Sequence, residues 1–271
     1  MTSSVAAVWG HRSVLRILVQ RDLAVKYQQS VLGYFWSLIE PLSLAVIYWF
    51  IFGFLYGGQI TDDMGLAISY PLFIISTIFG WAWFNSAIGE STAALTNQSR
   101  LVTTINMPRE IFPIGRVVGR FAEFVAGMPI LIGAAFIFDA QISWRTFVAI
   151  PLAVILQFAL LVGLSLILSA ANVMLQDIER FMRLVLRVLF YAAPIIYPLS
   201  KVNQSDMPGW VKTLYMANPL VGIMELYHAA WFKNDWPSNE LLIGTTVGCL
   251  VVLGVGMLVF RKMERAFLKE L

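Results

Sequence analysis

Apolar residues fall into six long blocks along the chain, separated by shorter polar segments. A helix that crosses the roughly 30 Å hydrocarbon core of a bilayer needs about 20 apolar residues. The pattern therefore predicts six transmembrane helices at about 35–57, 69–89, 112–138, 147–171, 181–198 and 241–260. The fifth block is the shortest and has Arg183 and Arg187 near its start. Pro194 and Pro198 are expected to kink this helix or end it.

The segment before the first block has the pattern of a weakly amphipathic helix. A step of 100° per residue places Arg16 near Gln20. Val14, Leu18 and Val25 then lie on the opposite, apolar side. A basic helix in this position is expected to lie along the cytoplasmic surface of the membrane.

Two roles are open for this helix. It is either an anchor that orients the chain or a helix that holds an anionic lipid headgroup at an entrance. Arg21 and Asp22 lie near its apolar side and weaken the amphipathic pattern. The candidate headgroup residues are Arg12, Arg16, Arg21 and Lys26, together with Arg116 and Arg120 of the third block.

Lysine and arginine are distributed unevenly between the two sides of the predicted membrane domain. Cytoplasmic segments of membrane proteins carry an excess of these residues. If the N-terminus is cytoplasmic, fifteen of the 19 basic residues fall on the cytoplasmic side. The external segments then hold only Arg145, Lys201, Lys212 and Lys233. Both termini are therefore predicted to be cytoplasmic, and the chain to be a multi-pass protein of the bacterial inner or plasma membrane.

Composition agrees with this interpretation and excludes several classes of protein. The 271 residues are 59% hydrophobic and 13% charged, against about 25% charged in soluble domains. Basic residues flank the apolar blocks and form no single patch, so nucleic acid is not an expected partner. With only His11 and His228, a histidine-based metal site is not expected. We assign no metal site, no bound cofactor and no catalytic residue.

Charged residues within the blocks have two interpretations each. Arg116, Arg120 and Glu123 share one face of the third block and form either an internal ion-pair cluster or a wall for a pyrophosphate headgroup. Glu40 lies within the first block, where it is either bonded inside the bundle or placed near a transport path. Glu225 lies three residues before His228, and ordinary helix contacts are expected for this pair.

Aromatic residues crowd the first and fifth blocks. Most are expected to form interfacial belts and lipid-facing surface. Some could instead line a path for a glycan, because sugar C–H faces pack on aromatic rings. The candidates for such a path are Tyr34, Phe35, Trp36, Tyr48, Phe190, Tyr191 and Tyr197.

The connection between the fifth and sixth blocks, residues 199–239, is long and largely apolar. Asn218 precedes Pro219, so a helix break is expected there. Two short helices that dip into the outer leaflet and return are predicted, because neither side of the break is long enough to span the core. They either thicken the outer rim or gate an exit, with Trp210, Tyr215, Pro219 and Glu225 as the gate candidates.

Four stretches of the sequence resemble a known family, in the family's order. These are LGYFWSLIEPLSLAVIYWFIFG at 32–53, SRLVTTINMPREIFPI at 99–114, NVMLQDIERF at 172–181 and NPLVGIMELYHAAWF at 218–232. They are similar to segments of the ABC-2-type permeases that export lipid-linked polysaccharides. At the third stretch, Gln176 stands before Asp177 where the family usually has a basic residue.

This resemblance implies an all-α membrane protein whose ATP hydrolysis is carried out by separate subunits. Two copies would form a twelve-span core, with two ATPase subunits docked inside that bind ATP and Mg²⁺. The chain itself has no GxxxxGK[ST] loop for nucleotide phosphates. The coupling residues implied by the family are Arg100, Leu101, Thr104, Met107, Pro108, Arg109 and Asp177.

A single transmembrane domain over 1–271 is predicted. Its parts are an interfacial helix at 1–33, a six-span core at 34–260 with a coupling segment at 98–109, and a cytoplasmic tail at 261–271. The substrate implied by the resemblance is a polyprenyl-linked glycan. An excess of arginine over lysine, typical of GC-rich genomes, favours a cell-wall galactan or O-antigen over teichoic acid. The alternatives are an ABC-2 exporter of drugs or lipids and a membrane-embedded enzyme that modifies glycans.

Overall fold

The computed structural model describes residues 10–28, 30–55, 57, 60–61, 67–104, 107–140, 142–232 and 236–270. Lys233, which is predicted to be external, lies outside the described residues, as does most of the connection at 58–68 between the first two predicted spans.

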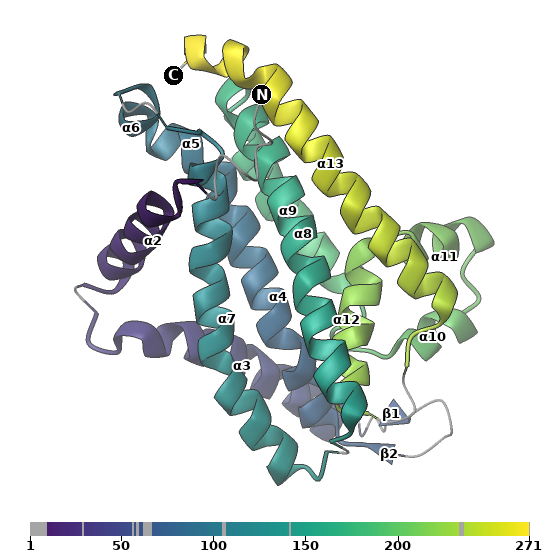
Figure 1. Ribbon diagram of the computed structural model, residues 1–271. Helices are drawn as coiled ribbons and strands as arrows, with labels where there is room; N and C mark the ends of the chain where they lie inside the picture. The colour runs from purple at the N-terminus through teal and green to yellow at the C-terminus, as the bar shows by residue number, and fades with distance from the viewer. Residues whose placement is uncertain are drawn as a thin grey trace.

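Helices make up most of the described chain (Figure 1). The N-terminal part contains α2 (Arg12–Tyr27), the 3₁₀ turn η1 (Gly33–Phe35), α3 (Trp36–Tyr48) and the π-helix η2 (Trp49–Leu55). Two antiparallel two-residue strands follow, β1 (Ile60–Thr61) and β2 (Ala67–Ile68). The remaining elements are α4 (Tyr70–Thr92), α5 (Ala94–Asn97), α6 (Ser99–Thr104), α7 (Ile111–Ile137), α8 (Trp144–Met174), α9 (Asp177–Tyr191), α10 (Leu199–Gln204), α11 (Gly209–Met216), α12 (Pro219–Ala229) and α13 (Asn239–Glu270).

Five of these helical segments are long and apolar enough to cross a membrane. They are Gly33–Leu55, Tyr70–Thr92, Ile111–Ile137, Trp144–Met174 and Asn239–Glu264. Each coincides with a predicted span, so the chain is a multi-pass, helical membrane protein. The predicted fifth span differs, because α9 has 15 residues and ends at Tyr191, before Pro194. At 1.5 Å per residue it is about 22 Å long, so a sixth full crossing is not established.

The two ends of the bundle hold different segments (Figure 1). At one end lie α5, α6, the start of α9 and the C-terminal end of α13. The β1–β2 ladder and the turn between α7 and α8 lie at the other end. Of the segments predicted to be cytoplasmic, α5, α6 and the C-terminal end of α13 thus share one end, and the turn before Arg145, which is predicted to be external, lies at the opposite end.

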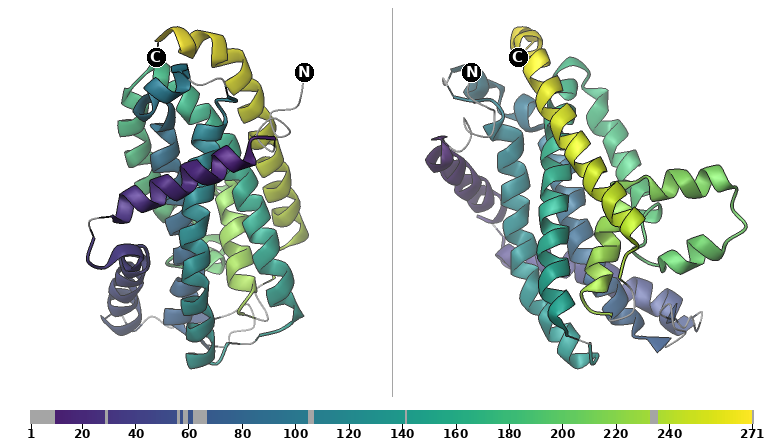
Figure 2. Two further views of the ribbon diagram at one scale, coloured as in Figure 1. Left: turned by 60° about the vertical axis from the view of Figure 1, so that its left-hand side comes forward. Right: turned by 45° about the vertical axis from the view of Figure 1, so that its right-hand side comes forward.

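Helices α8 and α13 run side by side over most of their length (Figures 1 and 2). Glycine permits this close approach, because a Cβ atom at Gly163 would lie 2.5 Å from the carbonyl oxygen of Val252. A Cβ atom at Gly256 would likewise collide with the carbonyl group of Gly163. The two backbones therefore touch at a pair of residues without side chains, as in other closely packed membrane helices.

A buried polar chain fixes α12 inside the bundle. The hydroxyl group of Tyr227 donates to Gln157 Oε1 over 2.9 Å, and Gln157 Nε2 donates to the carbonyl oxygen of Gly80 over 2.7 Å. These two hydrogen bonds join α12, α8 and α4. Both the oxygen and the nitrogen of the Gln157 amide have a partner. A side chain at Gly80 would overlap the ring of Tyr227, so this position keeps α12 against α4.

Helix α2 crosses α7 on the outside of the bundle (Figure 2, left). Gly115 and Gly119 on α7 leave room for it, since their missing Cβ atoms would lie 3.5 Å from Leu15 and 3.9 Å from Val19. Val14 and Leu18 of its predicted apolar side pack on the core. Val25 of the same side is exposed.

Helix α3 lies at a steep angle to α4 and α7 and covers one side of the bundle (Figures 1 and 2). Most of its large apolar side chains are exposed. The π-helix η2 continues it, with Gly53 close to the rings of Trp49 and Tyr70. An apolar surface of this size lies either against lipid or against another protein chain.

Candidate functional site

A network of ion pairs joins α2, α7 and α4 near the end of the bundle that holds α5 and α6. Arg116 Nη1 lies 3.1 Å from Asp22 Oδ2, which ties α7 to α2. Glu123 accepts hydrogen bonds from Lys26 Nζ over 3.1 Å and from the Tyr27 hydroxyl over 2.6 Å.

Arg120 is the centre of this network. Its side chain is buried, at 4% exposed. The guanidinium Nε donates to Glu90 Oε2 over 2.8 Å, and Nη1 contacts Glu123. The internal ion-pair interpretation of Arg120 and Glu123 is thus observed, with Glu90 as an additional partner. Burial, and next the hydrogen bond to Glu123, raise the pKa of Tyr27, so its hydroxyl stays protonated and keeps donating.

Four of the six predicted headgroup residues line one hollow, which we call the basic hollow. It has a volume of about 470 Å³ and is lined by Arg21, Asp22, Val25, Lys26, Glu90, Asn97, Gln98, Arg116 and Arg120. Arg12 and Arg16 do not line it, although both are exposed on α2. The structure therefore brings the residues of α2 and α7 together and leaves the start of α2 as a separate exposed basic segment.

Glu40 of the first block is expected either to bond inside the bundle or to lie near a transport path. It is exposed on α3, beside a small cavity also lined by Trp36, Lys26 and Glu123. Its carboxyl group accepts no hydrogen bond from any residue that the structure describes. Glu40 faces a cavity between α3, α4 and α7, and both interpretations of this residue therefore stay predictions.

The predicted coupling residues gather at one end of the bundle. Arg100 and Thr104 are exposed on α6, and Leu101 is half-buried. Met107 is only 9% exposed, and Pro108 and Arg109 follow it in a turn. Arg109 Nη1 lies 3.4 Å from Glu264 Oε1 on α13.

Asp177 lies close to this segment in space. Its side chain is fully accessible at the start of α9 and lies 3.8 Å from Arg180. A hollow of about 490 Å³ is lined jointly by Asp177, Gln176 and Thr96 of α5. The start of α9 and α5, which precedes α6, thus line one hollow that is open at the surface.

The predicted glycan-path aromatics form two groups. Tyr48, Phe190, Tyr191 and Tyr197 lie together: the Tyr48 and Phe190 ring centroids are 5.4 Å apart, and the Tyr48 and Tyr191 hydroxyls are 3.5 Å apart. Tyr215 extends this group, since its hydroxyl lies 3.4 Å from that of Tyr197.

The second group, Tyr34, Phe35 and Trp36, lies at the other end of α3, beside α2. The rings of Tyr27 and Tyr34 are 4.5 Å apart. Twelve residues separate Trp36 from Tyr48 along this helix, which is about 18 Å. The two groups do not form one continuous surface within a single chain.

The segment before α13 contains three short helices, α10, α11 and α12, and the break between α11 and α12 falls at Asn218, as predicted. The Asn218 side chain caps α12 by accepting from the Leu220 amide, and Pro219 occupies the first turn. Helices α10 and α11 project sideways from the bundle (Figure 2, right). Trp210 and Tyr215 belong to α11, and Pro219 and Glu225 belong to the inserted α12.

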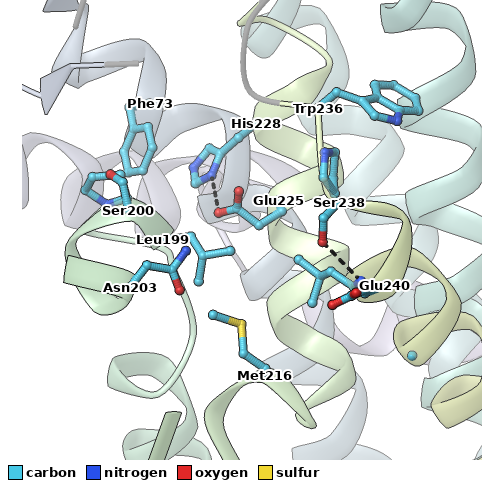
Figure 3. A pocket seen from close by; sticks show the side chains of 14 residues that line it. Phe73, Leu199, Ser200, Asn203, Met216, Glu225, His228, Trp236, Ser238 and Glu240 are labelled. Atoms are coloured by element: carbon cyan, nitrogen blue, oxygen red, sulfur yellow. Dashed lines mark hydrogen bonds and ion pairs between the residues drawn. The ribbon is translucent and has the colours of Figure 1, made fainter. Parts of the chain in front are cut away.

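Behind α10 and α11 lies a cavity of about 500 Å³, which we call the outer cavity (Figure 3). Glu225 and His228 of α12 share one wall, and the carboxylate lies 3.6 Å from His228 Nδ1. Glu240 comes from α13, and Trp236 from the connection before it. Among the described residues, no cluster of three or more His, Cys, Asp and Glu could hold a metal ion.

Several residues of these sites carry no clear signal in the sequence. Glu90 is thirty residues from Arg120, and nothing in its surroundings marks the pair. Glu240 and Trp236 are likewise brought to the outer cavity only by the fold. Asp22 did leave a signal, because it interrupts the apolar side of α2 where that helix meets Arg116.

Comparison with known proteins agrees with the resemblance seen in the sequence. Over 271 residues the chain is 25% identical to an O-antigen export system permease protein RfbA of Myxococcus xanthus, with 100% of both chains covered. It is 29% identical over 254 residues to a protein of that name from Klebsiella pneumoniae, covering 94% of this chain and 93% of the other. It is 23% identical to a polysialic acid transport protein KpsM of Escherichia coli, with 93% of each covered. The family model described as ABC-2 type transporter matches residues 13–232, and the chain therefore belongs to that family.

Proposed function

We propose that this protein is the membrane-spanning permease subunit of an ATP-driven exporter of a lipid-linked polysaccharide, of cell-wall galactan or O-antigen type. The observation that carries this proposal is the end-to-end similarity to permeases named for O-antigen and polysialic acid export. The similarity covers at least 93% of both chains, so it concerns the whole membrane domain.

The energy source is proposed to be a separate pair of ATPase subunits that bind ATP and Mg²⁺. The exposed surface of α6 and the start of α9 supports this assignment, since Arg100, Thr104 and Asp177 are all accessible there. ATP-driven closure of the ATPase pair would then move the helices as near-rigid bodies. The chain itself acts as a translocation path and performs no chemistry.

A second copy of the chain is proposed to complete the path. The large exposed apolar surface of α3 supports this, together with the exposed side chains of Phe181, Leu184 and Val188 on α9. In such a pair, α9 with the residues that follow it would form the remaining crossing, and α11 with α12 would form re-entrant helices on the external side. Irregular backbone at that depth is tolerated where protein or a water-filled cavity shelters it.

The orientation proposed for the chain has both termini in the cytoplasm. The shared position of α5, α6, the start of α9 and the end of α13 supports it. Single cysteines introduced in a Cys249→Ser background test this arrangement. Thr104→Cys should react only after the membrane is permeabilised, and Trp144→Cys should react in intact cells. The reverse result would overturn the orientation.

The function itself is tested by depleting the protein and analysing lipid extracts. If it exports a glycan, a polyprenyl-linked polysaccharide should accumulate on the cytoplasmic side and its surface counterpart should disappear. Re-expression of the chain should restore both. Normal glycan export in depleted cells would reject the proposal, and loss of drug resistance or lipid export instead would assign the chain to another branch of the family.

A further inference from the structure

The outer cavity contains a buried side chain whose polar atoms have no partner. His228 is 1% exposed, and neither ring nitrogen makes a hydrogen bond in the part of the chain that the structure describes. The nearest acceptor, Glu225 Oε1, lies 3.6 Å from Nδ1, beyond hydrogen-bond range. Buried polar groups in folded proteins are almost always paired with protein, water or ligand. The cavity that this side chain lines is wide enough to supply such a partner, either a water molecule or a ligand group.

The ring of His228 is held in place by stacking. The Phe73 and His228 ring centroids are 3.8 Å apart, with 17° between the planes. Glu225 belongs to the same helix one turn earlier, and its carboxylate faces the cavity beside the imidazole (Figure 3). A carboxylate and a neutral imidazole together offer acceptors and one N–H donor.

The other walls add polar groups and an aromatic ring. Asn203 comes from α10, and Ser238 and Glu240 lie at the start of α13 (Figure 3). Trp236 lines the same cavity, and the guanidinium carbon of Arg145 lies 5.8 Å from its ring centroid. The volume of about 500 Å³ falls within the range of roughly 300–1,000 Å³ that small-molecule sites occupy.

The charge of this lining narrows the class of ligand. Glu225 and Glu240 supply two carboxylates, and no lysine or arginine is among the lining residues described. Phosphate and other anions are disfavoured in such a cavity. A compact metal ion also fits poorly, because no three potential ligands converge in the described chain. The lining offers carboxylate acceptors, the amide of Asn203, serine hydroxyl groups and the indole ring of Trp236. These groups suit a ligand with several hydroxyl groups and an apolar C–H face.

We propose that the outer cavity binds one sugar residue of a neutral glycan on the external side of the permease. Glu225 and His228 would hydrogen-bond adjacent hydroxyl groups, since each hydroxyl both donates and accepts. Trp236 would pack on the C–H face of the sugar ring. The inference rests on the proposed polysaccharide export and deepens it, because it assigns uncharged sugar units to the carried chain.

Sugar binding to the full-length chain in lipid nanodiscs tests this inference without the ATPase. The neutral probes are methyl β-D-galactopyranoside, methyl α-D-mannopyranoside and methyl α-D-glucopyranoside, measured by calorimetry. At least one should bind with a dissociation constant in the millimolar range, about −4 kcal/mol. Methyl β-D-glucuronide should bind at least about tenfold more weakly, since its carboxylate would face Glu225 and Glu240.

Single substitutions in the outer cavity distinguish a loss of sugar binding from a loss of folding. Glu225→Gln and His228→Phe should each weaken binding about tenfold or more, because each removes a buried hydrogen-bonding group. Asn203→Ala, at an exposed position on α10, provides a further variant that should fold normally. Glu179→Gln removes a carboxylate at the opposite end of the bundle and should leave binding unchanged.

Two results would overturn the inference. One is the absence of saturable binding of all three neutral sugars to the wild-type chain, which would leave a water-filled cavity. The other is equal affinity in the wild type and in folded Glu225→Gln, His228→Phe and Asn203→Ala variants. Glucuronide binding as tight as that of the neutral sugars would overturn the assignment to uncharged units. A failed depletion experiment would instead reject glycan export itself, so the failure of one proposal can be distinguished from the failure of the other.

Discussion

Arg120 on α7 and Glu90 on α4 form an ion pair with 2.8 Å between Nε and Oε2, although thirty residues separate them in sequence. Glu123 contacts the same guanidinium and also accepts from Lys26 and Tyr27 of α2. A single buried arginine thus connects a surface helix to two helices of the bundle. Its position suggests that α2 moves together with α4 and α7.

Replacing this arginine should destabilise the protein strongly. Arg120→Leu leaves Glu90 without its cation and Glu123 with Lys26 as its cationic partner. Removal of one member of a buried pair typically costs about 3–5 kcal/mol. We expect a large fall in the thermal unfolding temperature of the purified chain. Arg180→Leu breaks an exposed pair on α9 and should change the temperature little. Similar behaviour of the two variants would mean that Arg120 is not a structural centre.

The glycine contact between α8 and α13 should tolerate no side chain. Gly163→Ala places a methyl group 2.5 Å from the carbonyl oxygen of Val252, so the helices must separate. Overpacking of this kind costs about 1–3 kcal/mol. Gly254→Ala on the same α13 meets nothing within 4 Å and is the matched control. Thermal unfolding of both variants measures the difference, and equal stability would contradict a tight contact.

The coupling surface is best tested at exposed positions. Arg100→Asp combined with Thr104→Asp should reduce the amount of ATPase that co-purifies, because both side chains face outward on α6. The unfolding temperature of the permease should remain that of the wild type. Met107→Asp would be ambiguous, since Met107 is buried and its replacement would disturb the fold. Lys201→Asp, on α10, is the control. If the α6 variant recovers as much ATPase as the wild type, the predicted coupling segment at 98–109 is only a connection between helices.

The basic residues at the start of α2 should attract anionic headgroups, by about 1 kcal/mol for each charge near the surface. Arg12→Gln combined with Arg16→Gln should therefore lower the export rate several-fold while insertion and ATPase association stay normal. Lys201→Gln removes a charge elsewhere and should not affect export. An unchanged export rate would leave α2 with the role of an anchor.

The gate hypothesis concerns α11 and the residues that follow α9. Tyr215 and Tyr197 touch through their hydroxyl groups, so Tyr215→Cys and Tyr197→Cys can be bridged by a short bismaleimide in a Cys249→Ser background. The bridged protein should lose export and retain its ATPase, whereas either single variant should export normally after the same treatment. Full export from the bridged protein would remove the gate.

Much of this architecture could be predicted from the sequence, because a block of about 20 apolar residues is typical of a transmembrane helix. The first, second, third, fourth and sixth blocks became helices within a few residues of their predicted bounds. The fifth block misled, because α9 begins earlier, at Asp177, and presents Arg183 and Arg187 to the outside. Periodicity finds which face of a helix is apolar, but it does not reveal a partner on another helix, as Glu90 and the outer cavity illustrate.

The ion pairs of α7 also have a consequence for biosynthesis. Arg116, Arg120 and Glu123 would be costly to place in a bilayer alone, because charged side chains within a membrane require partners. Their partners, Asp22, Lys26, Tyr27 and Glu90, all precede α7 in the chain. The ribosome makes the N-terminal part of the chain first. The residues that pair with the charges of α7 are therefore synthesised before α7 inserts into the membrane. The order of synthesis thus neutralises this helix as it inserts.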